Sequence, residues 1–174
     1  MHKRSFLFSL ATLATHPALA IYDPKPSGLL ESAAGAWKGT LTYRDYQNPD
    51  KMVVLPMRLA VSMTSPDELA LYYVFDDGPG KIVYSYERML FNVPKAELVW
   101  RSGSTKPRSN TYRITAATTT DRTSKVSFEK AGDSGVDRYR FEISQRAWTL
   151  SKAEVKSSGE ETLRSRYELT KSDA

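Results

Sequence analysis

The chain has 174 residues, a length that suits one domain with a single core, and its formal net charge is +5. It contains no cysteine, and its two histidines, His2 and His16, both lie among the first twenty residues. Beyond those residues, general-base, metal-ligand and nucleophile chemistry that needs an imidazole or a thiol is excluded, histidine-ligated haem included.

The first twenty residues have the three parts of a cleavable export signal. Lys3 and Arg4 form the basic start, residues 5–14 form an apolar run, and Ala18 and Ala20 give an A-x-A ending. The apolar run is shorter than the roughly 20 residues that a membrane-spanning helix needs. We therefore expect cleavage after Ala20 and a mature chain, residues 21–174, in a bacterial periplasm or outside the cell. An N-terminal anchor or a buried helix is the alternative.

The mature chain has an almost balanced charge. The signal contains two of the 25 basic residues and none of the 20 acidic ones, so 23 basic residues remain against 20 acidic ones. Charges of both signs are interspersed, which indicates a mixed surface rather than a nucleic-acid-binding one. We expect no nucleic-acid partner and no membrane span in the mature chain. Without cysteine, an exported domain must fold without disulfides.

Regular alternation of apolar and polar residues begins at Trp37. Only residues 27–34, just before it, look helical, and only for two turns. The period of two then continues through about ten short runs that end at turn residues, as half-buried strands do. The runs are residues 37–44, 55–63, 69–75, 82–90, 98–100, 112–116, 126–128, 139–143, 148–150 and 163–169.

This pattern predicts an all-β fold, an up-and-down antiparallel barrel of about eight to ten strands. A flat sheet would leave two long exposed edges, and closure into a barrel removes them. The short connections disfavour the alternative, a two-sheet sandwich with the long crossovers of a Greek key. A barrel of this size has room for its own side chains or for one small ligand.

A short motif opens the first strand directly behind the helical turn. Gly35-Ala36-Trp37 resembles the G-x-W signature of the lipocalins and the wider calycin group. The resemblance implies a single lipocalin-like barrel over residues 21–174, with Trp37 plugging its closed end. It also implies that a basic residue near the last strand packs over Trp37 in a cation–π contact. Arg164 or Arg166 would be that residue, and we assign Arg166.

A set of aromatic residues lies on the same side of the strands as the apolar residues, the side that we expect to face the barrel interior. Buried tyrosine hydroxyls need partners, so several of them around one cavity would give an apolar wall with polar handles. The alternative is that the same tyrosines fill a dry core. The expected ligand-binding residues are Tyr43, Tyr73, Tyr84, Tyr86, Arg88, Trp100 and Tyr112.

Arg88 falls in the apolar parity between Tyr86 and Leu90. If it faces the interior, it must be paired or hold an anionic ligand, and a fatty-acid carboxylate would suit it. The alternative is that the strand ends or bulges near Glu87 and that Arg88 reaches solvent.

The sequence contains no arrangement of residues that is typical of an active site. Ser127 and Lys130 match an S-x-x-K pattern, but positions i and i+3 of a strand face opposite ways. Asp76 and Asp77 lack the spacing of a calcium loop, and no two acids clearly share the inward parity. We therefore expect no enzymatic activity, no metal site and no cofactor.

These features predict an exported, soluble barrel that binds or carries a small, mostly apolar molecule, anionic and fatty-acid-like if Arg88 faces inward. The alternative is a non-catalytic structural or protein-interaction barrel of the bacterial envelope, which meets its partner through residues 76–80 and 102–109. A small outer-membrane barrel and an enzyme that uses Tyr, Asp, Glu or Lys are less favoured.

Overall fold

The computed structural model describes residues 28, 30–120, 123–132 and 135–172. The expected export signal lies outside the described residues. In the region expected to be helical, residues 27–34, a short 3-10 helix η1 spans Glu31–Ala33, while residues 27 and 29 are not described. In the described part of the chain, no helix has the length and apolar character needed to cross a membrane.

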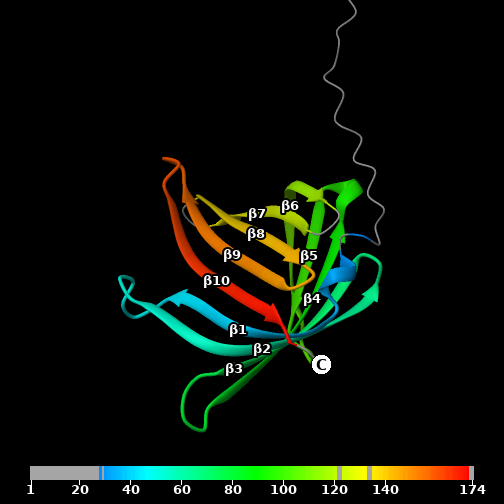
Figure 1. The fold of residues 1–174 in the computed structure, drawn as a ribbon. Helices are drawn as coiled ribbons and strands as arrows, with labels where there is room; N and C mark the ends of the chain where they lie inside the picture. Colours follow the sequence, from blue (N-terminus) through cyan, green and yellow to red (C-terminus); the bar gives the residue numbers. More distant parts are fainter. Residues whose placement is uncertain (1–27, 29, 121–122, 133–134, 173–174) are drawn as a thin grey trace, which may run out of the picture.

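The described residues form ten antiparallel strands, and each pairs with the next one along the chain (Figure 1). Strand β1 also pairs with β10, so the sheet closes into a barrel and the predicted up-and-down topology is confirmed. A second 3-10 helix, η2 Val93–Lys95, joins β4 to β5. The strands are β1 Gly35–Arg44, β2 Met52–Ser65, β3 Glu68–Asp76, β4 Ile82–Asn92, β5 Glu97–Ser102, β6 Arg108–Thr119, β7 Thr123–Gly132, β8 Gly135–Ser144, β9 Ala147–Lys156 and β10 Glu161–Lys171.

The two ends of the barrel differ. Helix η1 and the C-terminal end of β10 lie at one end, which we call the closed end (Figure 1). The hairpin tips between β1 and β2, β3 and β4, and β9 and β10 lie at the opposite end, which we call the open end, and they spread toward the left of the view. Because Leu30 and Ala33 beside and within η1 are fully buried, this segment caps the closed end.

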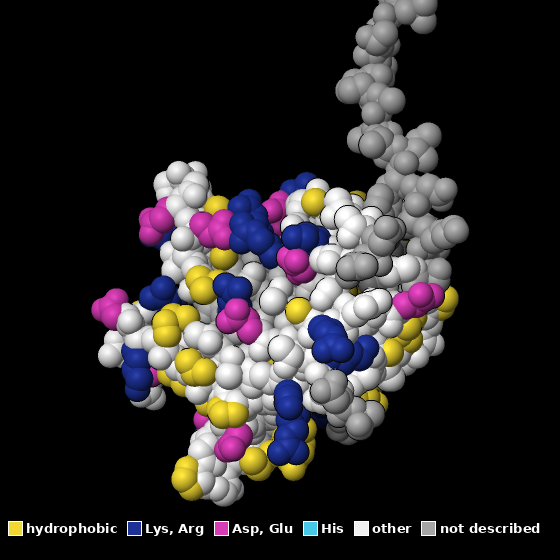
Figure 2. Space-filling view, in the orientation of Figure 1, with side chains coloured by type: hydrophobic (Ala, Val, Ile, Leu, Met, Phe, Trp, Pro, Cys, Tyr) yellow, Lys and Arg dark blue, Asp and Glu magenta, His cyan; other side chains and the backbone are white. Residues whose placement is uncertain are grey.

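The interior follows the predicted period of two on most strands. Apolar side chains point to the barrel axis, and polar ones alternate with them on the outside. On the face drawn in Figure 2, basic and acidic side chains are interspersed, with exposed hydrophobic ones between them. The largest side chains of the core are Trp37, Trp148, Phe128, Phe141, Leu30, Leu59, Leu69, Leu71, Met89, Leu98, Ile143 and Leu150.

Strand β4 does not follow the expected parity. Met89 is fully buried in the core and Glu87 shares its parity, so the odd-numbered residues of β4 face the interior. The expected inward orientation of Tyr84, Tyr86 and Arg88 is therefore wrong. The physical reason is that the outer face of β3 and β4 is itself apolar here, so hydrophobicity alone does not mark the inner side.

Three β-bulges or irregularities change the parity within strands of the described chain. The register shifts between Met63 and Ser65 on β2, between Ile114 and Ala116 on β6, and between Leu163 and Ser165 on β10. Leu163, expected inside with Tyr167 and Leu169, is consequently 38% exposed. Each bulge adds one residue to one strand, so the side chains beyond it point to the other face.

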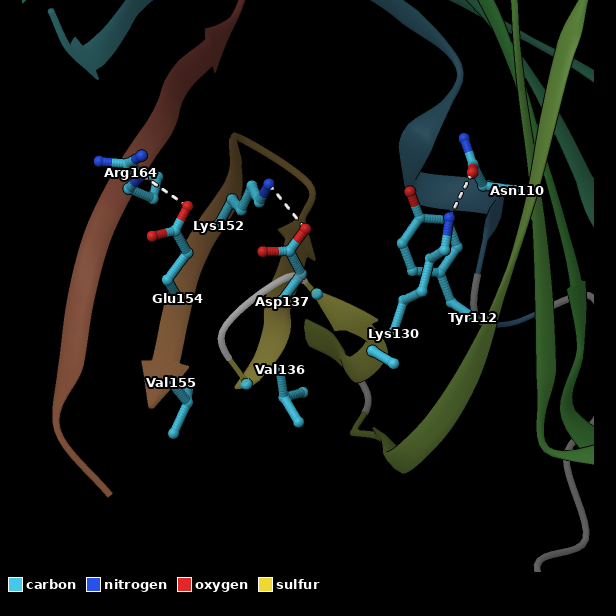
Figure 3. A pocket seen from close by; sticks show the side chains of 12 residues that line it. Asn110, Tyr112, Lys130, Val136, Asp137, Lys152, Glu154, Val155 and Arg164 are labelled. Carbon is cyan, nitrogen blue, oxygen red and sulfur yellow. Dashed lines mark hydrogen bonds and ion pairs between the residues drawn. The ribbon is translucent and has the colours of Figure 1, made fainter. Parts of the chain in front are cut away.

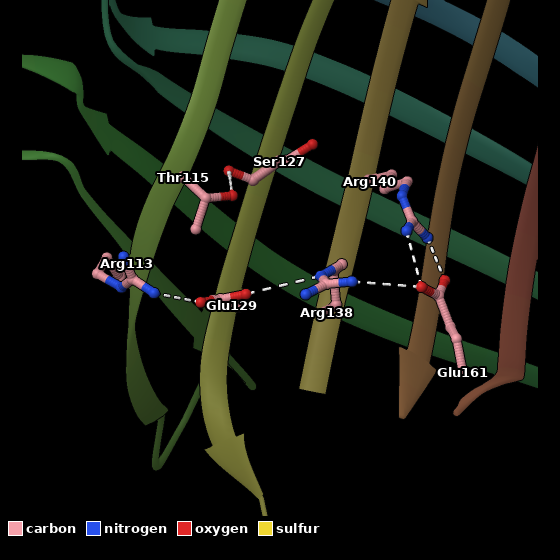
Figure 4. Close-up of polar contacts among 7 residues, drawn as sticks. All are labelled: Arg113, Thr115, Ser127, Glu129, Arg138, Arg140 and Glu161. Carbon is pink, nitrogen blue, oxygen red and sulfur yellow. Dashed lines mark hydrogen bonds and ion pairs between the residues drawn. The ribbon is translucent and has the colours of Figure 1, made fainter. Parts of the chain in front are cut away.

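A chain of ion pairs crosses the outer face from β6 to β10 (Figure 4). Glu129 pairs with Arg113 and Arg138, and Glu161 pairs with Arg138 and Arg140. The Arg140 guanidinium beside Glu161 lowers the pKa of that carboxyl. Solvent screens these pairs, so each contributes only about 0–1 kcal/mol, and they define the outside of the barrel rather than a site.

Candidate functional site

The closed end is filled by aromatic side chains. Trp37 packs against Trp148 with their ring centroids 5.9 Å apart, and Trp148 meets Phe141 edge-on at 4.8 Å. The indole Nε1 of Trp37 donates a hydrogen bond to the Ala33 carbonyl oxygen at 2.9 Å, which ties η1 to the core. This end of the barrel is therefore packed, and a ligand has no room in it.

A basic residue does pack over Trp37, but it is Lys171. The Lys171 ammonium lies 5.1 Å from the Trp37 ring centroid, and the two residues are direct partners across β1 and β10. Gly35 has φ +125°, and a Cβ there would lie 3.0 Å from Lys171 Cε, so glycine leaves room for the lysine stem. The assignment of Arg166 is wrong, because Arg166 is exposed and pairs with Glu168 at 2.8 Å.

Aromatic rings also fill much of the middle of the barrel. Trp100 lies 5.6 Å from Tyr139 and 6.0 Å from Tyr112, while Tyr139 stacks on Phe128 at 5.1 Å. On the other side of the interior, Tyr73 lies 5.8 Å from Tyr167. Burial raises the pKa of Tyr112, Tyr139 and Tyr167, so these hydroxyls are neutral in the folded protein.

Two polar groups stand out in this middle layer: a carboxylate with no ion-pair partner and a tyrosine hydroxyl with no hydrogen-bond partner among the described residues. The Glu87 carboxylate accepts a 2.8 Å hydrogen bond from the Trp100 indole Nε1, and burial raises the pKa of the Glu87 carboxyl. Tyr73 is only 2% exposed, and its hydroxyl has no hydrogen-bond partner among the described residues. Such groups are uncommon in protein interiors and call for an explanation.

Toward the open end, the interior widens into a hollow of about 550 Å³ with polar walls on β6 to β10 (Figure 3). We call it the polar hollow. Its charged side chains are largely neutralised in pairs: Lys152 with Asp137 and Arg164 with Glu154, both at 2.8 Å. Lys130 instead donates a 2.6 Å hydrogen bond to Asn110.

A second hollow of about 370 Å³ lies at the open end beside β1 to β4 and β10, and we call it the apolar hollow. Arg164 of β10 lines the polar hollow while Ser165 lines the apolar one, so the bulge of β10 separates the two walls. The residues that line the apolar hollow are Leu41, Tyr43, Tyr46, Leu55, Phe75, Asp77, Val83, Ser165 and Tyr167.

Four of the seven expected ligand-binding residues face the interior. Tyr43 lines the apolar hollow, Tyr112 lines the polar hollow, and Tyr73 and Trp100 belong to the middle layer. Of these four, Trp100 and Tyr112 lie side by side, with their ring centroids 6.0 Å apart.

The other three expected residues lie on the outer face. Tyr84 is 76% exposed, and Tyr86 packs against Tyr72 with their ring centroids 4.8 Å apart. Arg88 pairs with Glu68 at 2.5 Å outside the barrel. The anion-binding role considered for Arg88 in the interior therefore has no geometric basis.

The sequence interpretation missed the charged residues of the interior. Asp137 has the parity of Tyr139 and Phe141, and Lys152 has the parity of Trp148 and Leu150. Extending these two runs toward the open end would have found both residues. Glu87 was missed for a different reason, because the parity of its whole strand was misassigned.

Comparisons with known proteins bear on the fold. No protein-family model matches the sequence, and no curated protein is detectably similar to it. A solved structure, the crystal structure of Rv2717c from M. tuberculosis, is similar with a TM-score of 0.60 at 8% sequence identity. The similarity covers 86% of this chain and 99% of that chain. At this identity the likeness supports the fold alone, a closed ten-stranded antiparallel barrel consistent with a calycin-like barrel.

Proposed function

We propose that this protein is a lipocalin-like barrel that binds or carries a small, mostly apolar molecule in the open half of its interior. The observation that carries the proposal is the contrast between the two ends. Aromatic packing fills the closed end, whereas the open end has two adjoining hollows, one apolar and one polar. Pockets for small molecules combine a largely apolar wall with a few oriented polar groups.

The two hollows favour a ligand with an apolar body and one polar end. An apolar body fits against Leu41, Leu55 and Phe75, while the paired charges near Lys152 offer hydrogen bonds to a polar end. The cation–π contact of Lys171 with Trp37 supports the lipocalin-like assignment, since it supplies the basic residue that the resemblance implies.

We propose further that the barrel is not an enzyme and that it acts after export. Asp137 and Glu154 in the polar hollow are each held by a cation, which disfavours acid–base work by the pair. The export signal expected in residues 1–20 supports a periplasmic or extracellular location. The mass of the protein recovered from the envelope or medium tests this, because the proposal requires a chain that begins at Ile21. A full-length chain retained in the cytoplasm would contradict it.

A blocking substitution tests ligand binding. Val83→Trp puts a bulky ring at the mouth of the apolar hollow, so we expect the affinity for octanol to fall by about tenfold or more. Val54→Trp is the matched control, because Val54 is a valine that is 57% exposed and has the outward parity of β2. Isothermal titration calorimetry of wild type and both variants measures the difference.

The alternative function, a structural or protein-interaction barrel, has one observation in its favour. Val54, Tyr72, Ile82 and Tyr84 expose hydrophobic surface on the outside of β2 to β4. The same titration separates the two functions. Equal binding by both variants, or no binding of any apolar probe by the wild type, would contradict the ligand-binding proposal and leave the interaction function.

A further inference from the structure

The interior contains a carboxylate with no countercharge. Glu87 faces the barrel axis from β4, and among the described residues no lysine or arginine forms an ion pair with it. Its side-chain hydrogen bonds come from neutral groups, the Trp100 indole and the Ser85 hydroxyl of its own strand. An ionised carboxylate in such surroundings is poorly solvated, and a cation brought beside it would be stabilised.

Tyr73 places an unsatisfied hydroxyl beside Glu87. The two residues lie on adjacent strands, where Tyr73 pairs with Ser85 and Glu87 pairs with Leu71, so they are diagonal neighbours on the inner face. The buried Tyr73 hydroxyl has no partner, although a tyrosine oxygen can both donate and accept hydrogen bonds. Two acceptor oxygens, one of them charged, thus lie on the same part of the inner wall.

The surroundings of this wall favour a positive charge on the ligand. Tyr73 stacks on Phe75, which lines the apolar hollow, and Tyr167 lines the same hollow from β10. The faces of aromatic rings attract cations electrostatically. Asp77, the charged residue that lines the apolar hollow, forms an ion pair with Lys81, so the lining adds no net positive charge that would oppose a positively charged ligand. Glu87 itself is half-buried.

We propose that the barrel selects small amphipathic primary amines, whose ammonium group binds Glu87 and Tyr73 while the apolar body occupies the apolar hollow. This inference rests on the proposed ligand-binding function and names its ligand class. A primary ammonium has three N–H donors, as the lysine side chain does, and it can therefore satisfy the Glu87 carboxylate and the Tyr73 oxygen at once. Since burial raises the pKa of the Glu87 carboxyl, a bound cation would also relieve the cost of keeping it ionised.

A matched series of probes tests the selection. Octylamine, octanol and octanoate share one apolar chain and differ in the charge of the head group, and octylamine is protonated at neutral pH as lysine is. In calorimetric titrations of the full mature chain, octylamine should bind about tenfold or more tightly than octanol, and octanoate most weakly. Octyltrimethylammonium, which has no N–H donor, should bind less tightly than octylamine.

Two variants assign the preference to Glu87. Glu87→Gln keeps the shape and removes the charge, so octylamine should lose about tenfold in affinity while octanol changes by less than about twofold. Glu142→Gln removes an acidic charge from the outer face, where Glu142 pairs with Lys125, and should change neither affinity. The comparison of the four probes on the wild type needs no variant, so a folding defect in Glu87→Gln would not prevent the test.

The outcomes separate this inference from the proposed function. If octanol and octanoate bind as tightly as octylamine, the selection of amines is wrong and the ligand-binding barrel stands. If Glu142→Gln weakens octylamine as much as Glu87→Gln does, the attraction is a general surface effect and the assigned site is wrong. If no probe binds, both the inference and the proposed function are contradicted.

Discussion

Lys171 and Trp37 meet across the strand pair that closes the barrel, with the ammonium 5.1 Å from the ring centroid. The same ammonium donates a hydrogen bond to the Ser32 carbonyl oxygen at 3.4 Å. One side chain thus links the last strand, the first strand and the segment that caps the closed end. A cation over an indole stabilises a fold by about 0.5–2 kcal/mol.

We expect Lys171→Gln to lower the free energy of unfolding by about 1 kcal/mol, because it removes the charge above Trp37. Lys171→Arg should restore most of the loss, since a guanidinium also binds the face of an indole. Lys38→Gln is the control, because Lys38 is exposed, and it should change stability by less than about 0.5 kcal/mol. Urea unfolding of the four proteins measures these values, and equal losses in Lys171→Gln and Lys38→Gln would contradict the cation–π role.

Glu87 makes stability depend on pH. Burial raises the pKa of its carboxyl above the ordinary value of 4.5, so the folded chain binds the proton more tightly than the unfolded chain does. The stability that this proton supplies is present below pH 4.5 and is lost as the pH rises through the raised pKa.

Wild type should therefore lose stability relative to Glu87→Gln as the pH rises above 4.5 and through the raised pKa of the Glu87 carboxyl. Urea unfolding of both proteins across this range measures the difference. Glu142→Gln, which removes an exposed carboxyl, is the control. A difference between wild type and Glu87→Gln that stays constant with pH would show that Glu87 is not desolvated in the fold.

At the scale of elements, the closure of β1 onto β10 depends on a close approach at Gly39. A Cβ at this position would lie 2.0 Å from the Glu168 carbonyl oxygen, so the backbone of one strand would have to move. No side chain can fit there unless the pairing of β1 with β10 opens. The sequence places this glycine two residues after Trp37, inside a strand, where glycine commonly marks a close approach of another backbone.

Gly39→Ala should consequently destabilise the protein by about 3 kcal/mol, at the upper end of the cost of overpacking. Thr40→Ala, on the next residue of the same strand, should cost less than about 1 kcal/mol. Thermal unfolding compares the two variants. If Gly39→Ala is as stable as Thr40→Ala, β1 and β10 do not approach each other as closely at Gly39 as described.

The elements themselves were largely predictable from the sequence, because each strand has one apolar side and ends at turn residues. The period of two identified the strands and their approximate bounds, and the short connections gave their order. The alternation of residues predicted the wrong side-chain orientation where the chain departs from an ideal strand. The bulge between Leu163 and Ser165 turns Leu163 outward, and a bulge of this kind has no fixed sequence signature.

The candidate site was less predictable than the fold. On β4 the inner face has Ser85 and Glu87 toward the open end, whereas the outer face has Tyr84 and Tyr86. The inside of this strand is therefore more polar than its outside, and a rule that places hydrophobic residues inside gives the opposite answer. Glu87 is tolerated on the inner face because the Trp100 indole Nε1 donates a hydrogen bond to its carboxylate.

At the scale of the whole molecule, the barrel is organised as a packed end, an aromatic middle and a hollow end. Its three tryptophans report on this organisation, because Trp37 and Trp148 lie in the packed end and Trp100 lies in the middle layer beside Glu87. A ligand in the open half should approach Trp100 and leave the other two untouched. Trp37 and Trp148 are buried whereas Trp100 is half-buried, so the environments of the three indoles differ.

The indole N–H resonances of the three tryptophans, followed by NMR during titration with octylamine and with octanol, test the central claim most directly. The proposed function predicts that the Trp100 resonance, assigned by its loss in Trp100→Phe, shifts and saturates with either probe. The resonances of Trp37 and Trp148 should stay in place. Three unchanged resonances at saturating probe, or equal shifts in all three, would contradict a binding site in the open half of the barrel.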